Sequence, residues 1–182
     1  MARITGLIFT LDLGVRAGFA KGRPGEMPTS GIVILRSKQQ SLADALGNLA
    51  AFLHEQFTSE KPACVVKETV MALEAFKQMN MSQDSVYAQV KYHGVVEMMC
   101  NRFGIPWSDL SDSTARKHFI GKGRMGSRDA TKAAVVARCH ALGYFPKDCN
   151  DDNRADAVAI WDWAAANFGR MPSPLALFGT PA

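Results

Sequence analysis

Three acidic residues occupy positions from which they could act together on a ligand. Asp12 follows the apolar run 4–11, Glu68 follows a second apolar run at 63–66, and Asp156 lies inside an apolar segment near the C-terminus. A carboxylate in apolar surroundings is costly unless it is paired or binds a metal. Because ligands of α/β sheets bind at strand ends, the joint placement of these acids predicts a shared site.

Two further residues could complete this site. Asp152 stands four residues before Asp156 and Asn153 stands three before it, so either side chain could project from the same side of a helix start. Oxygen ligands without converging Cys or His suit Mg²⁺ or Mn²⁺ rather than zinc. Ordinary alternatives exist: an acid at the helix start can be a cap, and Lys67 with Glu68 can form a surface ion pair.

The apolar pattern predicts the elements that would carry these side chains. It favours an α/β domain over residues 1–170, with a central mixed five-stranded sheet flanked by helices, and a loosely ordered tail at 171–182. The first three strands should form an antiparallel meander. Strands are expected at 4–11, 17–20, 31–35, 63–66 and just after 104–106, and helices at 41–57, 82–103, 113–119, 127–142 and 153–168.

The helix predicted at 82–103 is apolar on two faces. One face carries Ala88, Tyr92, Val95, Met99 and Phe103, the second carries Tyr87, Gly94 and Met98, and a narrow polar arc holds Gln89, His93 and Glu97. Such a helix is buried on both sides. Two interpretations stay open: a central helix within one chain, or a second face that contacts a partner subunit.

Composition restricts the class of protein. The chain has 182 residues, 47% of them hydrophobic, and a net charge of +4, as in an ordinary globular protein. Its apolar runs are shorter than the roughly 20 residues that a membrane span needs, and its start lacks a signal-peptide pattern, so we expect a cytoplasmic protein. The four cysteines are far apart, which favours free thiols.

Positive charge is concentrated in one segment, residues 113–138. It has one acid, Asp129, and the glycines Gly121, Gly123 and Gly126. A charge run can be a solvated face, but the intervening glycines favour a surface that binds phosphate groups. The seven cationic residues are Arg116, Lys117, Lys122, Arg124, Arg128, Lys132 and Arg138.

Several of these motifs together resemble one family, the RuvC-type Holliday junction resolvases of the RNase H-like superfamily. The resemblance spans about residues 5–168 and implies an RNase H-like fold. It is carried by Ile8–Gly14 with Gly18–Ala20, by Val65–Thr69, by Gly121–Arg124 with Lys132 downstream, and by Ala155–Ala159.

The resemblance implies metal-dependent cleavage of four-way DNA junctions that leaves 5′-phosphate and 3′-hydroxyl ends. Two divalent ions, Mg²⁺ or Mn²⁺, would bind the scissile phosphate and activate a water molecule. The ligands would be Asp12, Glu68 and Asp156, with Asp152 in the fourth position and Asn153 as the alternative, and Lys132 would contact the scissile phosphate.

The resemblance also implies contacts with DNA and between subunits. Bacterial members carry an aromatic wedge three residues after the second acid, where this chain has Met71, so Met71 or Phe76 is expected to unstack the junction. The resemblance is to a divergent member of the family, of phage or prophage type. A homodimer through helix 82–103 would cut two strands symmetrically. The remaining residues expected on DNA are Arg116, Lys117, Lys122, Arg124, Arg128 and Lys132.

Three other functions fit part of the pattern. An RNA-processing nuclease would share the acids without preferring junctions. An actin-like nucleotide binder would use Asp12–Gly14 but needs a second phosphate loop and about twice the length. A non-catalytic nucleic-acid module would place repelling acids against DNA.

Overall fold

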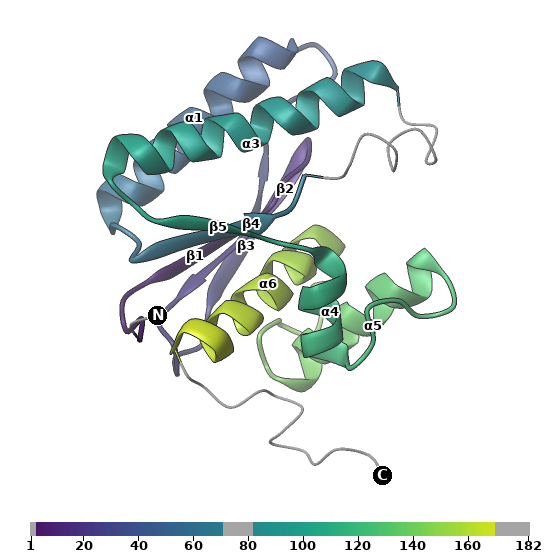
Figure 1. Ribbon diagram of the computed structural model, residues 1–182. Coiled ribbons are helices and arrows are strands. Elements are labelled where there is room, and N and C mark those ends of the chain that lie inside the picture. The colour runs from purple at the N-terminus through teal and green to yellow at the C-terminus, as the bar shows by residue number, and fades with distance from the viewer. Residues whose placement is uncertain (1–2, 71–81, 170–182) are drawn as a thin grey trace.

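The sheet is built from five strands in the order β3-β2-β1-β4-β5 (Figure 1). The structure is a computed structural model and describes residues 3–70 and 82–169. The predicted tail and the segment 71–81 lie outside these ranges. The strands are β1 (Ile8–Asp12), β2 (Arg16–Gly22), β3 (Thr29–Ile34), β4 (Cys64–Glu68) and β5 (Trp107–Leu110).

The direction of the strands determines where the acids lie. β1, β2 and β3 form the predicted antiparallel meander, whereas β1 pairs with β4 and β4 pairs with β5 in parallel. The carboxyl ends of β1, β4 and β5 therefore lie at one edge of the sheet. Asp12 is the last residue of β1 and Glu68 the last of β4, so the strand-end placement predicted for both acids is confirmed.

Helices cover both faces of the sheet (Figure 1). The pair α1 (Leu42–Ser59) and α3 (Gln83–Phe103) lies on one face. The group α4 (Asp112–Ile120), α5 (Arg128–Ala141) and α6 (Asp152–Gly169) lies on the other. The predicted α/β architecture with a mixed five-stranded sheet is correct, and helix ends differ from the prediction by only one or two residues.

Side chains alternate between the two faces of the sheet because a strand has a period of two. Phe9, Leu11 and Val65 pack into the core beneath α1 and α3, and Ile8 and Val66 pack into the core beside α6. The helix α6 is apolar on nearly all sides because nearly its whole circumference is buried.

The long helix α3 meets the sheet through both its apolar and its polar residues. Ala88, Tyr92 and Met99 are buried as predicted, but His93 in the polar arc is buried too, beneath the helix. The second apolar face, which includes Tyr87 and Met98, is exposed in this single chain.

Two smaller expectations can be compared with the structure. All four cysteines are free thiols, and three of them are buried. Over the described ranges, we find no helix with both the length and the apolarity needed to cross a bilayer.

Candidate active site

Strand alternation directs Asp12 and Glu68 to the same face of the sheet. Thr10, two residues before Asp12, donates a hydrogen bond to the Ala157 carbonyl of α6 at 2.8 Å. Because side chains two residues apart in a strand point to the same face of the sheet, Asp12 faces α6 as well. Glu68 accepts a hydrogen bond from the Leu13 amide at 3.0 Å, which fixes it beside the end of β1. Burial raises the pKa of Asp12 well above its usual range, and the nearby charges of Glu68 and Asp156 raise it further.

Asp156 reaches this edge from α6, which packs across β1 and β2. Its side chain is buried and accepts two hydrogen bonds from Arg116 of α4, from Nε at 3.1 Å and from Nη2 at 2.8 Å. This bidentate geometry is the strongest form of the Arg–carboxylate pair. A carboxylate in apolar surroundings needs a partner, and in the structure the partner of Asp156 is Arg116.

Asp112 is a further carboxylate of the site that the sequence analysis did not identify. It lies two residues after β5, the third parallel strand, and its Oδ2 atom is 3.2 Å from Nη2 of Arg116. Burial raises the pKa of Glu68 to about 8, and the negative charge of Asp112 makes the second-largest contribution to this rise. The sequence did contain a signal, because Asp112 also follows a predicted strand.

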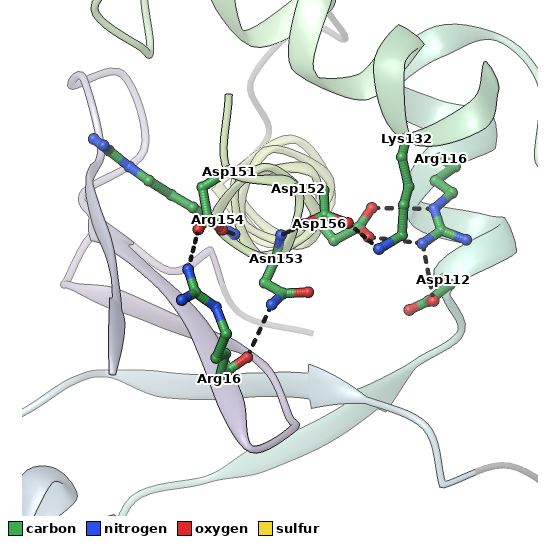
Figure 2. Close-up of polar contacts among 9 residues, drawn as sticks. All are labelled: Arg16, Asp112, Arg116, Lys132, Asp151, Asp152, Asn153, Arg154 and Asp156. Carbon is green, nitrogen blue, oxygen red and sulfur yellow. Dashed lines mark hydrogen bonds and ion pairs between the residues drawn. The ribbon is translucent and has the colours of Figure 1, made fainter. Parts of the chain in front are cut away.

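Asp152 and Asn153 point in different directions at the start of α6 (Figure 2). Asp152 forms an ion pair with Lys132 of α5. Burial tends to raise the pKa of Asp152, but the hydrogen bond and charge of Lys132 outweigh it and lower that pKa. Asn153 instead donates from Nδ2 to the Arg16 carbonyl at 3.1 Å, on the β2 side of the helix.

Asp151 caps the start of α6, a role that an acid at a helix start can take. Its Oδ1 atom accepts a hydrogen bond from the Arg154 amide at 3.0 Å, and its Oδ2 atom pairs with Arg16 at 2.8 Å. Asp152 and Asp156 are therefore left on the side of α6 that faces Lys132 and Arg116 (Figure 2).

Two residues of the cationic segment contact this group of carboxylates. Arg116 and Lys132 are partly buried and point at Asp156 and Asp152 (Figure 2). The other predicted DNA contacts in α4, in the α4–α5 loop and in α5 are exposed to solvent; they are Lys117, Lys122, Arg124 and Arg128. Met71 and Phe76, the predicted wedge residues, lie outside the described residues.

Two glycines of this segment have structural roles in addition to any contact with phosphate. Gly121 ends α4 in the left-handed conformation, with φ of 79°, where glycine is favoured. Gly123 packs against α4, since a Cβ atom there would lie 3.1 Å from the Ser113 carbonyl oxygen. Gly126, in contrast to Gly123, faces open space.

The chemistry of the donor set fits a hard divalent cation. All the donors are carboxylate oxygens, and the raised pKa values of Asp12, Glu68 and Asp112 arise from burial together with the repulsion of neighbouring acids. As they stand, however, no three acidic, histidine or cysteine side chains in residues 3–70 and 82–169 are arranged to hold a metal ion. Arg116 lies between Asp112 and Asp156 instead (Figure 2).

Lys67 lies on the opposite face of the sheet from Glu68, so the two do not form a surface ion pair. Its side chain is fully buried, with Nζ 3.0 Å from His93 Nδ1, 3.1 Å from Glu97 and hydrogen-bonded to Asp109. Trp107 covers it, with its ring centroid 4.8 Å from Nζ. The polar arc of α3 therefore provides partners for a buried lysine.

Comparison with known proteins gives structural matches only. No protein-family model matches the sequence, and no curated protein does. Solved structures match the fold, two of them being structures of one bacterial protein. The structure of Thermus thermophilus RuvC has a TM-score of 0.63 and 16% identity, and T. thermophilus RuvC in complex with a Holliday junction substrate has 0.64 and 17%. Each match covers 85% of this chain and 90% of the other. The chain thus has the fold of RuvC, as predicted.

Proposed function

From the RuvC fold and the carboxylates at its sheet edge, we propose that this protein is a metal-dependent endonuclease that resolves four-way DNA junctions. One observation carries the proposal: Asp12, Glu68 and Asp156 come from β1, β4 and α6 to one edge, beside Arg116 and Lys132. The acids would repel the phosphates of DNA bound on the adjacent cationic surface unless a metal ion neutralised them. The arrangement therefore favours metal-dependent catalysis over simple binding.

The residues that would hold two Mg²⁺ or Mn²⁺ ions are Asp12, Glu68, Asp156 and Asp152. Asp152 is preferred to Asn153 because its carboxylate lies on the side of Lys132, whereas the Asn153 amide is bonded to the Arg16 carbonyl. When bound, the ions would lower the pKa of a water molecule and neutralise charge on the phosphate.

The chain's own cations would position the scissile phosphate. Lys132 and Arg116 have their charged groups beside Asp152 and Asp156, so a phosphate bound at the carboxylates would lie within their reach (Figure 2). In the reaction, a water oxygen forms a bond to phosphorus while the bond to the 3′ oxygen breaks and that oxygen takes a proton. The products carry 5′-phosphate and 3′-hydroxyl ends.

The exposed cations next to the site would bind the DNA backbone. Lys117, Lys122, Arg124 and Arg128 lie on α4, on the loop that follows it and on α5, the same side of the sheet as the carboxylates. Contacts of this kind supply affinity without sequence information. Unstacking at the branch point is proposed for Met71 or Phe76.

The exposed face of α3 would join two copies of the chain. Tyr87 is 53% exposed, Val90 48% and Met98 55%, and Gly94 between them faces open space, so a second helix could approach closely. These residues repeat at the helical spacing that gives one apolar stripe. A twofold dimer would carry two sites for the two strands of one junction.

Cleavage of defined substrates tests the proposal. A labelled four-way junction, a matched linear duplex and an RNA–DNA hybrid are incubated with Mg²⁺ or with EDTA, using the wild type and Asp156→Asn. We expect the wild type to cut the junction in Mg²⁺ only and the variant to bind the junction without cutting it. Equal cutting of all three substrates would support an RNase H-like nuclease without junction preference, and cutting in EDTA would contradict metal dependence.

A further inference from the structure

We propose that Arg116 is an internal counter-ion of the carboxylate site: it holds Asp156 and Asp112 when no metal is bound, and it releases Asp156 when a divalent ion binds. This inference rests on the proposed function, because it concerns how the same site changes between its metal-free and metal-loaded states. It assigns Arg116 a role in metal binding in addition to its contact with DNA.

The geometry of the pair carries the first step. Arg116 donates to both oxygens of Asp156, at 3.1 and 2.8 Å, and the same Nη2 atom lies 3.2 Å from Oδ2 of Asp112 (Figure 2). The Asp156 side chain is only 8% exposed, so its charge has little solvation by water. A buried carboxylate needs such a partner, and Arg116 supplies it without a metal.

The surrounding groups show why the site needs this cation. Lys132 is engaged with Asp152, and within the described residues no cationic side chain is paired with Asp12 or Glu68. Two acids of the site thus have Arg116 and one has Lys132. Of the remaining two, Asp12 has its pKa raised by burial and by the charge of Glu68. A divalent ion at Asp12, Glu68 and Asp156 would compete directly with the Arg116 guanidinium for the Asp156 oxygens.

The position of Arg116 allows its release. It lies one helical turn after Asp112 on α4, an i,i+4 spacing at which the two side chains are neighbours. Its side chain is 19% exposed, so part of it already reaches solvent. Once a divalent ion takes Asp156, the guanidinium is repelled by that ion and is free to contact a phosphate. Metal binding and DNA binding would therefore favour each other through Arg116.

Titration calorimetry with Mn²⁺ tests the competition directly. Arg116→Gln removes the cation, Arg116→Lys keeps the charge but loses the bidentate fork, and Arg102→Gln removes the same charge from the far end of α3 as a matched control. We expect Arg116→Gln to bind Mn²⁺ at least about tenfold more tightly than the wild type. Arg116→Lys should fall between them, and Arg102→Gln should match the wild type.

Thermal unfolding and cleavage give the second and third readouts. The metal-free Arg116→Gln protein should melt several degrees below the wild type, and saturating Mn²⁺ should remove most of that difference. The same variant should cut the junction more slowly although it binds metal more tightly, since it lacks the phosphate contact. A residue that only stabilises the fold would not move binding and cleavage in opposite directions.

The outcomes separate this inference from the function it rests on. Equal Mn²⁺ affinity in the wild type and Arg116→Gln, with junction cleavage by the wild type intact, overturns the counter-ion role alone. Weaker Mn²⁺ binding in Arg116→Gln would make Arg116 a support of the metal site and would also overturn it. Absence of both Mn²⁺ binding and cleavage in the wild type would contradict the proposed function itself.

Discussion

Gly18 of β2 lies directly against the Asn153 carbonyl at the start of α6, so closely that a Cβ atom on Gly18 would overlap that carbonyl group. Gly18 is also the residue that pairs with Asp12 across the β1–β2 ladder. The first turn of α6 therefore passes over the strand pair that carries Asp12. This close approach is what brings Asp152 and Asp156 to the edge where β1 ends.

Replacing Gly18 by alanine should separate these elements. The added methyl group has no space, so we expect a loss of about 1–3 kcal/mol in the free energy of unfolding and weaker binding of Mn²⁺ as α6 moves away from β1. Chemical denaturation and calorimetry measure the two effects. Gly47→Ala is the control, because Gly47 is on the exposed side of α1 with open space around it. That change should stabilise the protein by about 0.5–1 kcal/mol; a neutral Gly18→Ala would contradict the packing argument.

The fourth ligand can be identified by two substitutions at the start of α6. Asp152→Asn should reduce junction cleavage by more than the roughly 10- to 100-fold typical of an outer-shell partner. Asn153→Ala should change it far less, because the Asn153 amide is bonded to the Arg16 carbonyl. Initial cleavage rates in Mg²⁺ measure both, and the reverse order of effects would assign the fourth position to Asn153.

Lys132→Ala should slow cleavage while preserving the metal site. Lys132 is paired with Asp152, and its loss removes a cation that would contact the phosphate but removes no carboxylate. We expect cleavage to fall by about 100- to 1000-fold and Mn²⁺ affinity to stay the same or increase. Single-turnover cleavage and calorimetry separate the two quantities. A variant that cut at the wild-type rate would remove Lys132 from the catalytic group.

The sheet and the three main acids were predictable from sequence because each depends on local patterns. Apolar runs indicate the strands, and an acid at the end of a run places Asp12 and Glu68 without knowledge of the partners. The same reasoning would have reached Asp112, had the strand at 107–110 been followed to its end.

The remaining features depend on contacts between distant elements. Lys67 is adjacent to Glu68 in sequence, but alternation along β4 sends it to α3, and only the packing of that helix supplies His93 and Glu97 as partners. The Arg116–Asp156 pair likewise depends on how α4 lies against α6. Neither helical nor strand periodicity relates Arg116 to Asp156, because the two residues are 40 positions apart in the sequence.

His93 should make the protein less stable in acid. Burial and the charge of Lys67 lower the pKa of His93 to about 4, against an ordinary value of 6.5. Between these values the unfolded state binds the proton and the folded state does not. The contribution of His93 to the free energy of unfolding is therefore fully present above about pH 6.5. It is lost as the pH falls toward 4, by at most about 1.4 kcal/mol per pH unit. Asp12 and Glu68 act in the opposite direction because their pKa values are raised.

The contribution of His93 can be isolated with His93→Gln, which keeps a hydrogen-bonding side chain beside Lys67 but does not titrate. Urea unfolding at pH 7, 5.5 and 4.5 should show the wild type losing its advantage over this variant as the pH falls. His54→Gln, on the exposed side of α1, is the control and should keep the pH dependence of the wild type. A gap between wild type and His93→Gln that stays constant with pH would contradict the assignment.

The exposed stripe on α3 predicts that the protein is a dimer that one charge can dissociate. A carboxylate at Met98, in the middle of a closely packed apolar interface, would be buried without a partner. Met98→Glu should therefore halve the molar mass in light scattering while leaving the melting temperature of the subunit nearly unchanged. Ile34→Glu is the matched control, because Ile34 is 59% exposed on β3, away from α3, and the variant should remain dimeric. A wild type that is monomeric at micromolar concentration, or a dimer that dissociates only with Ile34→Glu, would show that α3 does not join the subunits.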